Sequence, residues 1–222
     1  MKRLKRLILW SGAAFLLVSV MLVLPLRWIN PPVTAFMLED WWKSDRRPAQ
    51  EWVALRNISP QLRIAVIASE DQLFPHHYGF DLKMIADAME GEPDQRRGAS
   101  TISQQVAKNL YLWGGRSYFR KGLEAWLTLL IETFWPKERI LEVYLNTAEF
   151  GRGIYGAGAA SKQLFGKAAS RLNRYEAALL AAVLPNPKWR KANRPSAYVK
   201  KRAFEIMLAI SELGGVAYLR QI

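Results

Sequence analysis

Cysteine is absent from the 222-residue chain, and histidine occurs only twice, as the adjacent pair His76 and His77. The absence of cysteine excludes disulfide bonds, a cysteine-ligated zinc site and a thiol nucleophile. Two neighbouring histidines do not favour a multi-histidine metal centre. Half of the residues are hydrophobic and 12% are aromatic, so the chain can bury a sizeable core and global disorder is excluded.

Acidic residues are few beside basic ones, 19 against 32, which gives a formal net charge of +13. This surplus indicates an anionic partner without distinguishing nucleic acid, membrane or a phosphorylated substrate. Residues 1–27 contain no acid and five bases, so the remainder of the chain carries +8. We expect much of that remainder to favour an anionic membrane face. The five N-terminal bases are Lys2, Arg3, Lys5, Arg6 and Arg27, and the remainder includes Lys200, Lys201 and Arg202.

Twenty consecutive uncharged residues, 7–26, would span roughly 30 Å as a helix, which is the thickness of the bilayer interior. A cleaved signal peptide is the alternative, but its apolar region would be about 7–15 residues long and would precede a small-x-small cleavage site. The length favours an uncleaved transmembrane anchor at 7–26. Four bases precede it, so the N-terminus is expected in the cytoplasm and residues 28–222 outside, which argues against nucleic acid as a partner.

After the anchor, residues 27–54 are predicted to be a connector and residues 55–222 a single all-α domain. The apolar run before Glu70 could be a strand, although we favour a buried helix. Asn173 and Glu176 have the spacing of a helix-capping box. No alternating strand pairs with hairpin turns are recognisable. Further helices are expected at 81–89, 101–111, 118–134, 138–147, 174–184 and 197–213. A loop is expected at 91–98, and a glycine-rich stretch covers 151–158.

The first polar cluster consists of Glu70 and Asp71, which directly follow an apolar run. A carboxylate beside apolar walls has a raised pKa, because burial disfavours its charged form. That is the setting of a general acid or base. The alternative is an ordinary surface helix end.

The second cluster places Thr101, Gln105 and Lys108 on one face of a helix. Free N–H groups at a helix start, with hydroxyls and a lysine, would form a phosphate cradle. A capped helix with a solvated polar face explains the same residues.

The third cluster, Arg120, Lys121 and Glu124, has the spacing of an exposed helical ion pair. Its functional alternative is two cations that hold a diphosphate beside a carboxylate. A fourth cluster covers residues 137–146.

In this order the four clusters resemble the motifs of the peptidoglycan glycosyltransferase family, over about residues 55–195. Any one motif is moderately specific, whereas four in order are very specific. The matching residues are Glu70, Asp71, Phe74, His77 and Gly79; Gly98, Ser100, Thr101, Ile102, Gln104, Gln105, Lys108 and Asn109; Arg120, Lys121 and Glu124; and Lys137, Ile140, Leu141, Glu142, Tyr144, Leu145 and Asn146.

The resemblance implies a lysozyme-like α-helical fold with a small jaw lobe that faces the membrane, in a monofunctional biosynthetic enzyme. The implied reaction polymerises lipid II into β-1,4-linked glycan strands and releases undecaprenyl diphosphate in a single inverting displacement. The enzyme is expected in the bacterial inner membrane, with its catalytic domain in the periplasm. Its expected partners are lipid II, the growing glycan strand, membrane lipids and proteins of cell-wall synthesis or division.

The resemblance also implies the site residues. Glu70 would be the general base. Glu124 would assist the departing diphosphate, either through a divalent cation, Mg²⁺ or Mn²⁺, or by orienting the cations around it. No organic cofactor is expected. The substrate-binding set would comprise Asp71, Phe74, Ser100, Thr101, Gln105, Lys108, Asn109, Arg120 and Lys121.

Two other classes of function remain open on sequence alone. In a lytic transglycosylase or lysozyme, Glu70 would be a general acid that helps to cleave glycan, but this explains the cationic cluster and the anchor less well. A non-enzymatic, membrane-anchored scaffold of cell-wall synthesis would need neither carboxylate.

Overall fold

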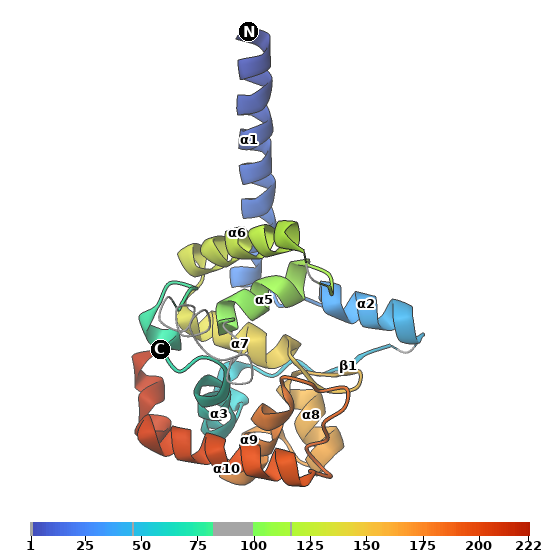
Figure 1. Cartoon of the computed structure of the whole chain (residues 1–222), viewed down its shortest axis with the longest axis vertical. Coiled ribbons are helices and arrows are strands. Elements are labelled where there is room, and N and C mark those ends of the chain that lie inside the picture. Colours follow the sequence, from blue (N-terminus) through green and yellow to red (C-terminus); the bar gives the residue numbers. More distant parts are fainter. Residues whose placement is uncertain (1, 46, 82–99, 116) are drawn as a thin grey trace.

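The structure is a computed structural model that describes residues 2–45, 47–81, 100–115 and 117–222. A long N-terminal helix projects from one end of a compact helical body (Figure 1). The loop predicted at 91–98, and the helix predicted at 81–89 apart from Asp81, lie outside the described residues.

Helices account for most of the described chain, so the all-α prediction is confirmed. The favoured buried helix before Glu70 is also confirmed, and the strand alternative is wrong. The α-helices are α1 (Lys2–Val23), α2 (Ala35–Ser44), α3 (Pro60–Glu70), α5 (Ile102–Tyr111), α6 (Tyr118–Phe134), α7 (Lys137–Thr147), α8 (Gly156–Phe165), α9 (Arg174–Val183) and α10 (Ala197–Glu212). The short 3-10 helices are η1 (Leu24–Arg27), η2 (Leu55–Asn57), η3 (Phe74–His76), η5 (Ala169–Arg171) and η6 (Gly215–Gln221).

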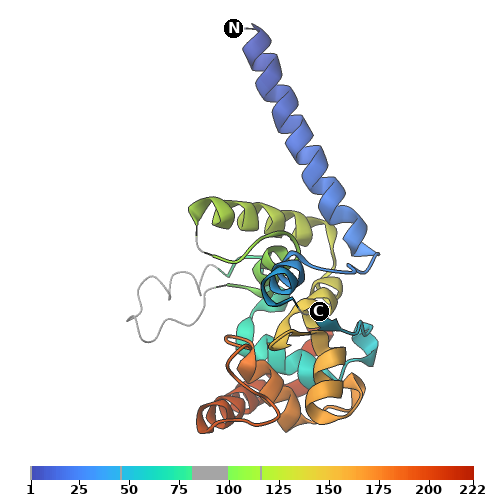
Figure 2. The ribbon, with the colours of Figure 1, turned by 90° about the vertical axis from the view of Figure 1, so that its right-hand side faces the viewer.

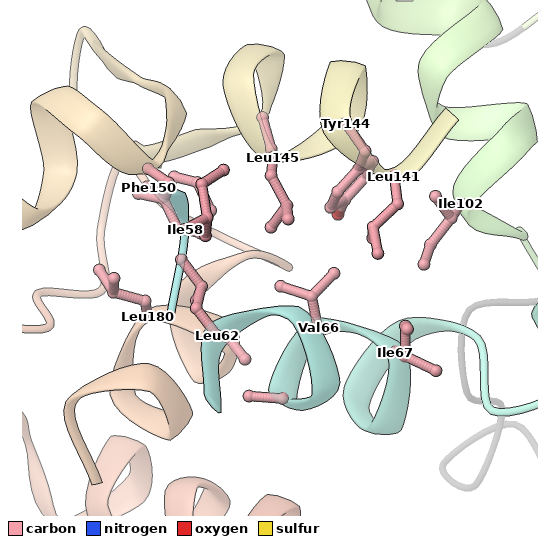
Figure 3. Close-up of a cluster of buried hydrophobic side chains, with 14 of the residues drawn as sticks. Ile58, Leu62, Val66, Ile67, Ile102, Leu141, Tyr144, Leu145, Phe150 and Leu180 are labelled. Atoms are coloured by element: carbon pink, nitrogen blue, oxygen red, sulfur yellow. The ribbon is translucent and has the colours of Figure 1, made fainter. Parts of the chain in front are cut away.

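Helix α3 forms the centre of the core, between α7 on one side and α9 on the other (Figure 3). Five consecutive residues, 64–68, are buried, which explains why the run lacks a helical polar face. Ser59 starts the helix by accepting a hydrogen bond from the Gln61 amide, and Pro60 occupies the first turn. This central helix carries Glu70 on its last turn.

A small three-stranded sheet corrects the expectation that strand pairs are absent. It consists of β1 (Ala49–Gln50), β2 (Glu149–Gly151) and β3 (Ile154–Tyr155), in the order β1-β3-β2. Strands of two or three residues are too short to show alternation in the sequence. The glycine-rich stretch 151–158, to which the sequence assigned no element, contains β3 and the start of α8.

The segment expected to be a connector is folded onto the domain. Helix α2 packs against α5, and β1 pairs with β3. Its sequence gave no periodic pattern of sufficient length to predict these contacts. The domain limits drawn from the sequence stay predictions.

Helix α1 and helix α10 lie at opposite ends of the molecule (Figures 1 and 2). Among the described residues, Lys2–Arg27 is the one helical stretch long and apolar enough to cross a membrane. Helices α5 and α6 lie on the α1 side of the domain (Figure 1). The predicted small lobe stays a prediction. The expectation that Lys200, Lys201 and Arg202 favour the membrane face stays a prediction. Helix α10 carries all three at the end of the molecule away from α1 (Figure 1).

The base of α1 and the turn after it contact α6 and α7. Val23 is fully buried, and its carbonyl oxygen accepts a hydrogen bond of 3.0 Å from the Trp135 indole. The guanidinium of Arg139 donates two hydrogen bonds of 3.0 Å to the carbonyl oxygen of Leu26. Helix α1 and the domain therefore meet at a packed junction.

Candidate active site

Glu70 lies at the carboxyl end of α3, partly exposed and facing α5. Its Oε2 accepts a hydrogen bond of 2.8 Å from the side-chain amide of Gln105. Burial raises the pKa of Glu70, and the hydrogen bond from Gln105 and the charges of Arg202 and Lys108 oppose this rise. A carboxylate with a raised pKa and one accessible side is suited to accepting a proton.

Gln105 is itself held in position by the core. The buried Tyr144 hydroxyl of α7 donates a hydrogen bond of 3.3 Å to Gln105 Oε1. This contact orients the amide so that its nitrogen faces Glu70. Tyr144 was recognised in the sequence only as part of the fourth motif, without a role.

Asp71 is buried and positions the backbone around Glu70. Its Oδ2 accepts a hydrogen bond of 2.9 Å from the Ile102 amide, at the start of α5. Its Oδ1 lies 2.8 Å from His77 Nε2, and His77 Nδ1 accepts the Gly79 amide at 3.0 Å. Because Nδ1 is an acceptor, the proton resides on Nε2 and is donated to Asp71. Asp71 thus ties the loop after α3 to α5.

Two further predicted substrate residues also have internal contacts. Thr101 is fully buried and caps α5 in a capping box with Gln104. Its hydroxyl group donates a hydrogen bond of 2.7 Å to the carbonyl oxygen of Gly79. Phe74 is fully buried beneath the ammonium group of Lys137, 4.6 Å from its ring centre. Their substrate-binding roles stay predictions, and these contacts give both residues a structural role.

Ser100 and Asn109, at the start of α5 and on its third turn, are partly exposed. Neither side chain makes a hydrogen bond within the described part of the chain. Both side chains are available to a ligand, and their substrate-binding roles stay predictions.

Glu124 and its two cations form the second half of the site, on α6. The guanidinium group of Arg120 donates a hydrogen bond of 2.8 Å to Oε2 of Glu124. The ammonium group of Lys121 lies 2.5 Å from Oε1 of the same carboxylate. The Glu124 residue is only 2% exposed, so the interpretation of this cluster as an exposed ion pair is wrong. A fully buried carboxylate requires such partners.

Lys108 lies between the two halves. Burial lowers its pKa, and the charges of Glu124 and Glu70 oppose this fall only in part, since Arg120 and Lys121 add to it. Its ammonium group is 5.4 Å from the centre of the Phe36 ring on α2 and makes no hydrogen bond within the described residues. Lys108 is thus a cation close enough to both carboxylates to interact with a ligand that lies between them.

The described residues around Glu124 do not fit a divalent cation. Both carboxylate oxygens are already bound by cations, and such ions prefer several oxygen ligands. Within the described ranges, no group of three histidine, aspartate or glutamate residues could hold a metal ion. Glu124 is therefore treated below as a partner of Arg120 and Lys121, and no reaction step is derived through a metal.

Residues of the fourth motif hold the scaffold together. Oε2 of Glu142 accepts a hydrogen bond of 2.9 Å from the Leu55 amide. The Asn146 side chain makes two hydrogen bonds with the backbone of Val53. The ammonium group of Lys137 donates hydrogen bonds of 2.8 Å to the Glu132 carboxylate and of 2.6 Å to the carbonyl oxygen of His77. These contacts fix the segment before α3 and the loop after it.

Arg202 is the residue near Glu70 that sequence reasoning did not assign to the site. Its charge favours the ionised form of Glu70, although it comes from α10. No sequence signal could have found it, because it lies far from every motif along the chain. The packing of α10 against α3 brings it close.

Comparison with known proteins decides the family. A family model described as "Transglycosylase" matches residues 38–210, which is most of the chain and includes every residue of the site. The chain belongs to the transglycosylase family. It is therefore a glycosyltransferase with the lysozyme-like fold of that family, as the motif resemblance predicted.

Relatives match this transglycosylase over its whole length. A protein of Pseudomonas putida strain F1 is 54% identical, over 100% of this chain and 95% of its own. Proteins of Pseudomonas entomophila and of Xanthomonas campestris pv. campestris strain B100 are each 52% identical, over 100% and 99% of this chain and 95% and 94% of their own. All three are named biosynthetic peptidoglycan transglycosylase.

Proposed function

We propose that this transglycosylase polymerises lipid II into β-1,4-linked glycan strands and releases undecaprenyl diphosphate. The observation that carries the proposal is the position of Lys108. It lies near the base candidate Glu70 and also near the cluster of Glu124, Arg120 and Lys121. A sugar diphosphate placed there would have its reacting carbon near a base and its phosphates near three cations.

In the proposed reaction, Glu70 accepts the proton of the 4-hydroxyl group of the acceptor sugar. The freed oxygen attacks the anomeric carbon of the donor strand, and the bond from that carbon to the diphosphate breaks. One displacement converts the α-linked donor into a β-1,4 bond. The hydrogen bond from Gln105 keeps the carboxylate directed toward the acceptor.

The leaving diphosphate gains charge as the bond breaks, and its stabilisation is the largest electrostatic demand of the step. Lys108, Arg120 and Lys121 supply compensating positive charge. Glu124 holds Arg120 and Lys121 in place by hydrogen bonds of 2.8 and 2.5 Å. Ser100, before the start of α5, and Asn109, on its third turn, are available to bind the donor.

The proposed location is the bacterial inner membrane, in a single pass, with the N-terminus in the cytoplasm and the domain in the periplasm. Four bases before the apolar span support this orientation. Protease treatment of intact spheroplasts should cleave the domain and spare the first residues. Proteins of cell-wall synthesis or division are the proposed partners, and cross-linking in cells would identify them.

A lipid II polymerisation assay on the full chain tests the function. Wild type should produce strands, and Glu70→Gln should lose about 10²–10⁴-fold in rate. Glu138→Gln is the matched control, because Glu138 is exposed on α7. Parallel reactions with chelator and with added Mg²⁺ or Mn²⁺ test the predicted cation.

Finished glycan strands should remain intact under the same conditions. Cleavage of these strands, without polymerisation of lipid II, would support the lytic alternative instead. Near-normal polymerisation by Glu70→Gln would remove Glu70 from the role of base.

A further inference from the structure

A cavity of about 400 Å³ lies outside the catalytic site, between the turn joining β2 to β3 and the loop joining α9 to α10. Its floor is apolar and includes the buried Phe150 together with Ile154 and Leu164. The helices around it, α8 to α10, occupy the part of the domain away from α1 (Figures 1 and 2). None of the four motifs contributes a residue to its lining.

Five cationic side chains line this cavity: Arg152, Lys188, Arg190, Lys191 and Arg194. The segment 186–202 that supplies most of them contains seven bases and no acid. Such a concentration of one charge around a concave surface attracts an anion. It also accounts for much of the +8 that the chain carries beyond its N-terminal segment.

Two of these cations are fixed by the protein. Lys188 forms an ion pair with Asp40 of α2. The guanidinium group of Arg190 donates a hydrogen bond of 3.3 Å to the carbonyl oxygen of Ala182. The same group lies over the ring of Tyr198, 4.6 Å from its centre. Within the described residues, Arg152, Lys191 and Arg194 make no hydrogen bond or ion pair. The cavity thus has a preorganised wall and three cations available to a ligand.

An aromatic side chain stands on the same loop. Trp189, between Lys188 and Arg190, is 76% exposed. An exposed indole ring offers a flat apolar face, on which a sugar ring can pack, while guanidinium groups bind carboxylates in pairs of hydrogen bonds. Together these groups favour a ligand that combines sugars with carboxylates.

We propose that this cavity, the distal basic pocket, binds the carboxylate-bearing peptide branches of a glycan strand, with Trp189 packed against the adjoining sugar. The proposal rests on the proposed function, because that reaction yields a strand whose disaccharides each carry a peptide ending in a carboxylate. A lipid headgroup fits less well, since the pocket lies away from the helix that would enter the bilayer. The pocket would retain the product strand outside the catalytic site.

Binding of soluble, uncross-linked glycan strands to the full chain in detergent micelles tests the proposal. The strands are prepared independently, so their binding is measured whether or not the protein polymerises lipid II. Arg152→Gln combined with Arg194→Gln should lower affinity at least tenfold and leave the polymerisation rate unchanged. Arg56→Gln combined with Arg171→Gln is the control of equal charge, because both arginines are exposed and lie outside the pocket lining.

Three comparisons complete the test. Strands stripped of their peptides should bind at least tenfold more weakly, and Trp189→Ala should weaken binding of strands but not of the free peptide. Equal affinity for stripped and intact strands would overturn the proposal, as would equal losses in the two double variants. Tighter binding of polyglutamate than of strands would also overturn it and indicate an acidic protein partner.

Discussion

The side-chain amide of Gln105 donates a hydrogen bond of 2.8 Å to Oε2 of Glu70. The two residues come from different helices, α5 and α3, and the core holds both helices in place. The bond favours the ionised form of a carboxyl group whose burial favours the neutral form. Gln105 is therefore one of the groups that oppose the rise in the pKa of Glu70 and extend its action as a base to lower pH.

Replacing Gln105 with methionine should move the acid limb of the pH profile of kcat/KM to higher pH. Glu70 is a base only when ionised, and loss of the hydrogen bond raises its pKa further. The rate on the acid limb should fall about tenfold, as expected for one charge-assisted hydrogen bond, and recover as the pH rises. Gln72→Met is the control, because Gln72 bonds the Ala68 carbonyl instead. An unmoved acid limb in Gln105→Met would contradict this coupling.

Glu124→Gln should lower the free energy of unfolding by about 3–5 kcal/mol, because it leaves the cation of Arg120 without its buried partner. The Arg120 side chain is only 11% exposed, whereas that of Lys121 is 48% exposed. Lys121→Gln should therefore cost less than about 1 kcal/mol. Denaturant unfolding of the full chain in detergent measures both values. Similar small losses would mean that Glu124 is not buried in solution.

Arg139→Ala should loosen the junction between α1 and the domain. Its guanidinium binds the carbonyls of Leu26 and Ile29 and pairs with Glu142 at 2.6 Å. Stability should fall by about 3 kcal/mol, and amide hydrogen exchange over residues 24–30 should accelerate.

Arg27→Ala is the comparison for this junction. Arg27 is exposed and makes one hydrogen bond of 2.7 Å, to the Phe134 carbonyl. Its loss should cost less than about 1.5 kcal/mol. If amide hydrogens over residues 24–30 exchange at the same rate in Arg139→Ala and Arg27→Ala, Arg139 does not hold the junction.

Gly158→Ala should destabilise the protein by about 1–3 kcal/mol, because a Cβ there would overlap the carbonyl oxygen of Glu51. Gly122→Ala provides the opposite expectation. A Cβ at Gly122 of α6 meets nothing within 4 Å, so alanine should stabilise the helix by up to about 1 kcal/mol. Thermal unfolding distinguishes the two signs. A stabilising Gly158→Ala would contradict the close packing of α8 on the segment before α3.

Helices with regular apolar spacing and local end signals could be predicted from the sequence. The capping box of Asn173 and Glu176 forms as expected, with hydrogen bonds of 2.9 and 3.0 Å. Helix α6 has the predicted limits, since Pro136 closes the pattern soon after it ends. The sheet and α8 could not be predicted, because short strands and glycine-rich helices lack a period and depend on contacts with distant segments.

The candidate site was predictable in its residues but not in its arrangement. The motifs identified Glu70, Gln105, Lys108 and Glu124, and α3, α5 and α6 carry them toward one another. The burial of Glu124 and the internal partner of Thr101 depend on helix packing, so a list of residue types could not show them.

The sequence by itself determined the apolar N-terminal span, the helical class of the domain and the chemical identity of the site residues, because these depend on local pattern and residue type. Only the tertiary structure decided that Arg202 lies near Glu70 and that the basic segment 186–202 lines a pocket away from α1. Both outcomes depend on how α10 packs against α3 and α9. The direction in which a charged side chain points is set by such contacts between distant segments, and they leave no mark on the neighbouring sequence.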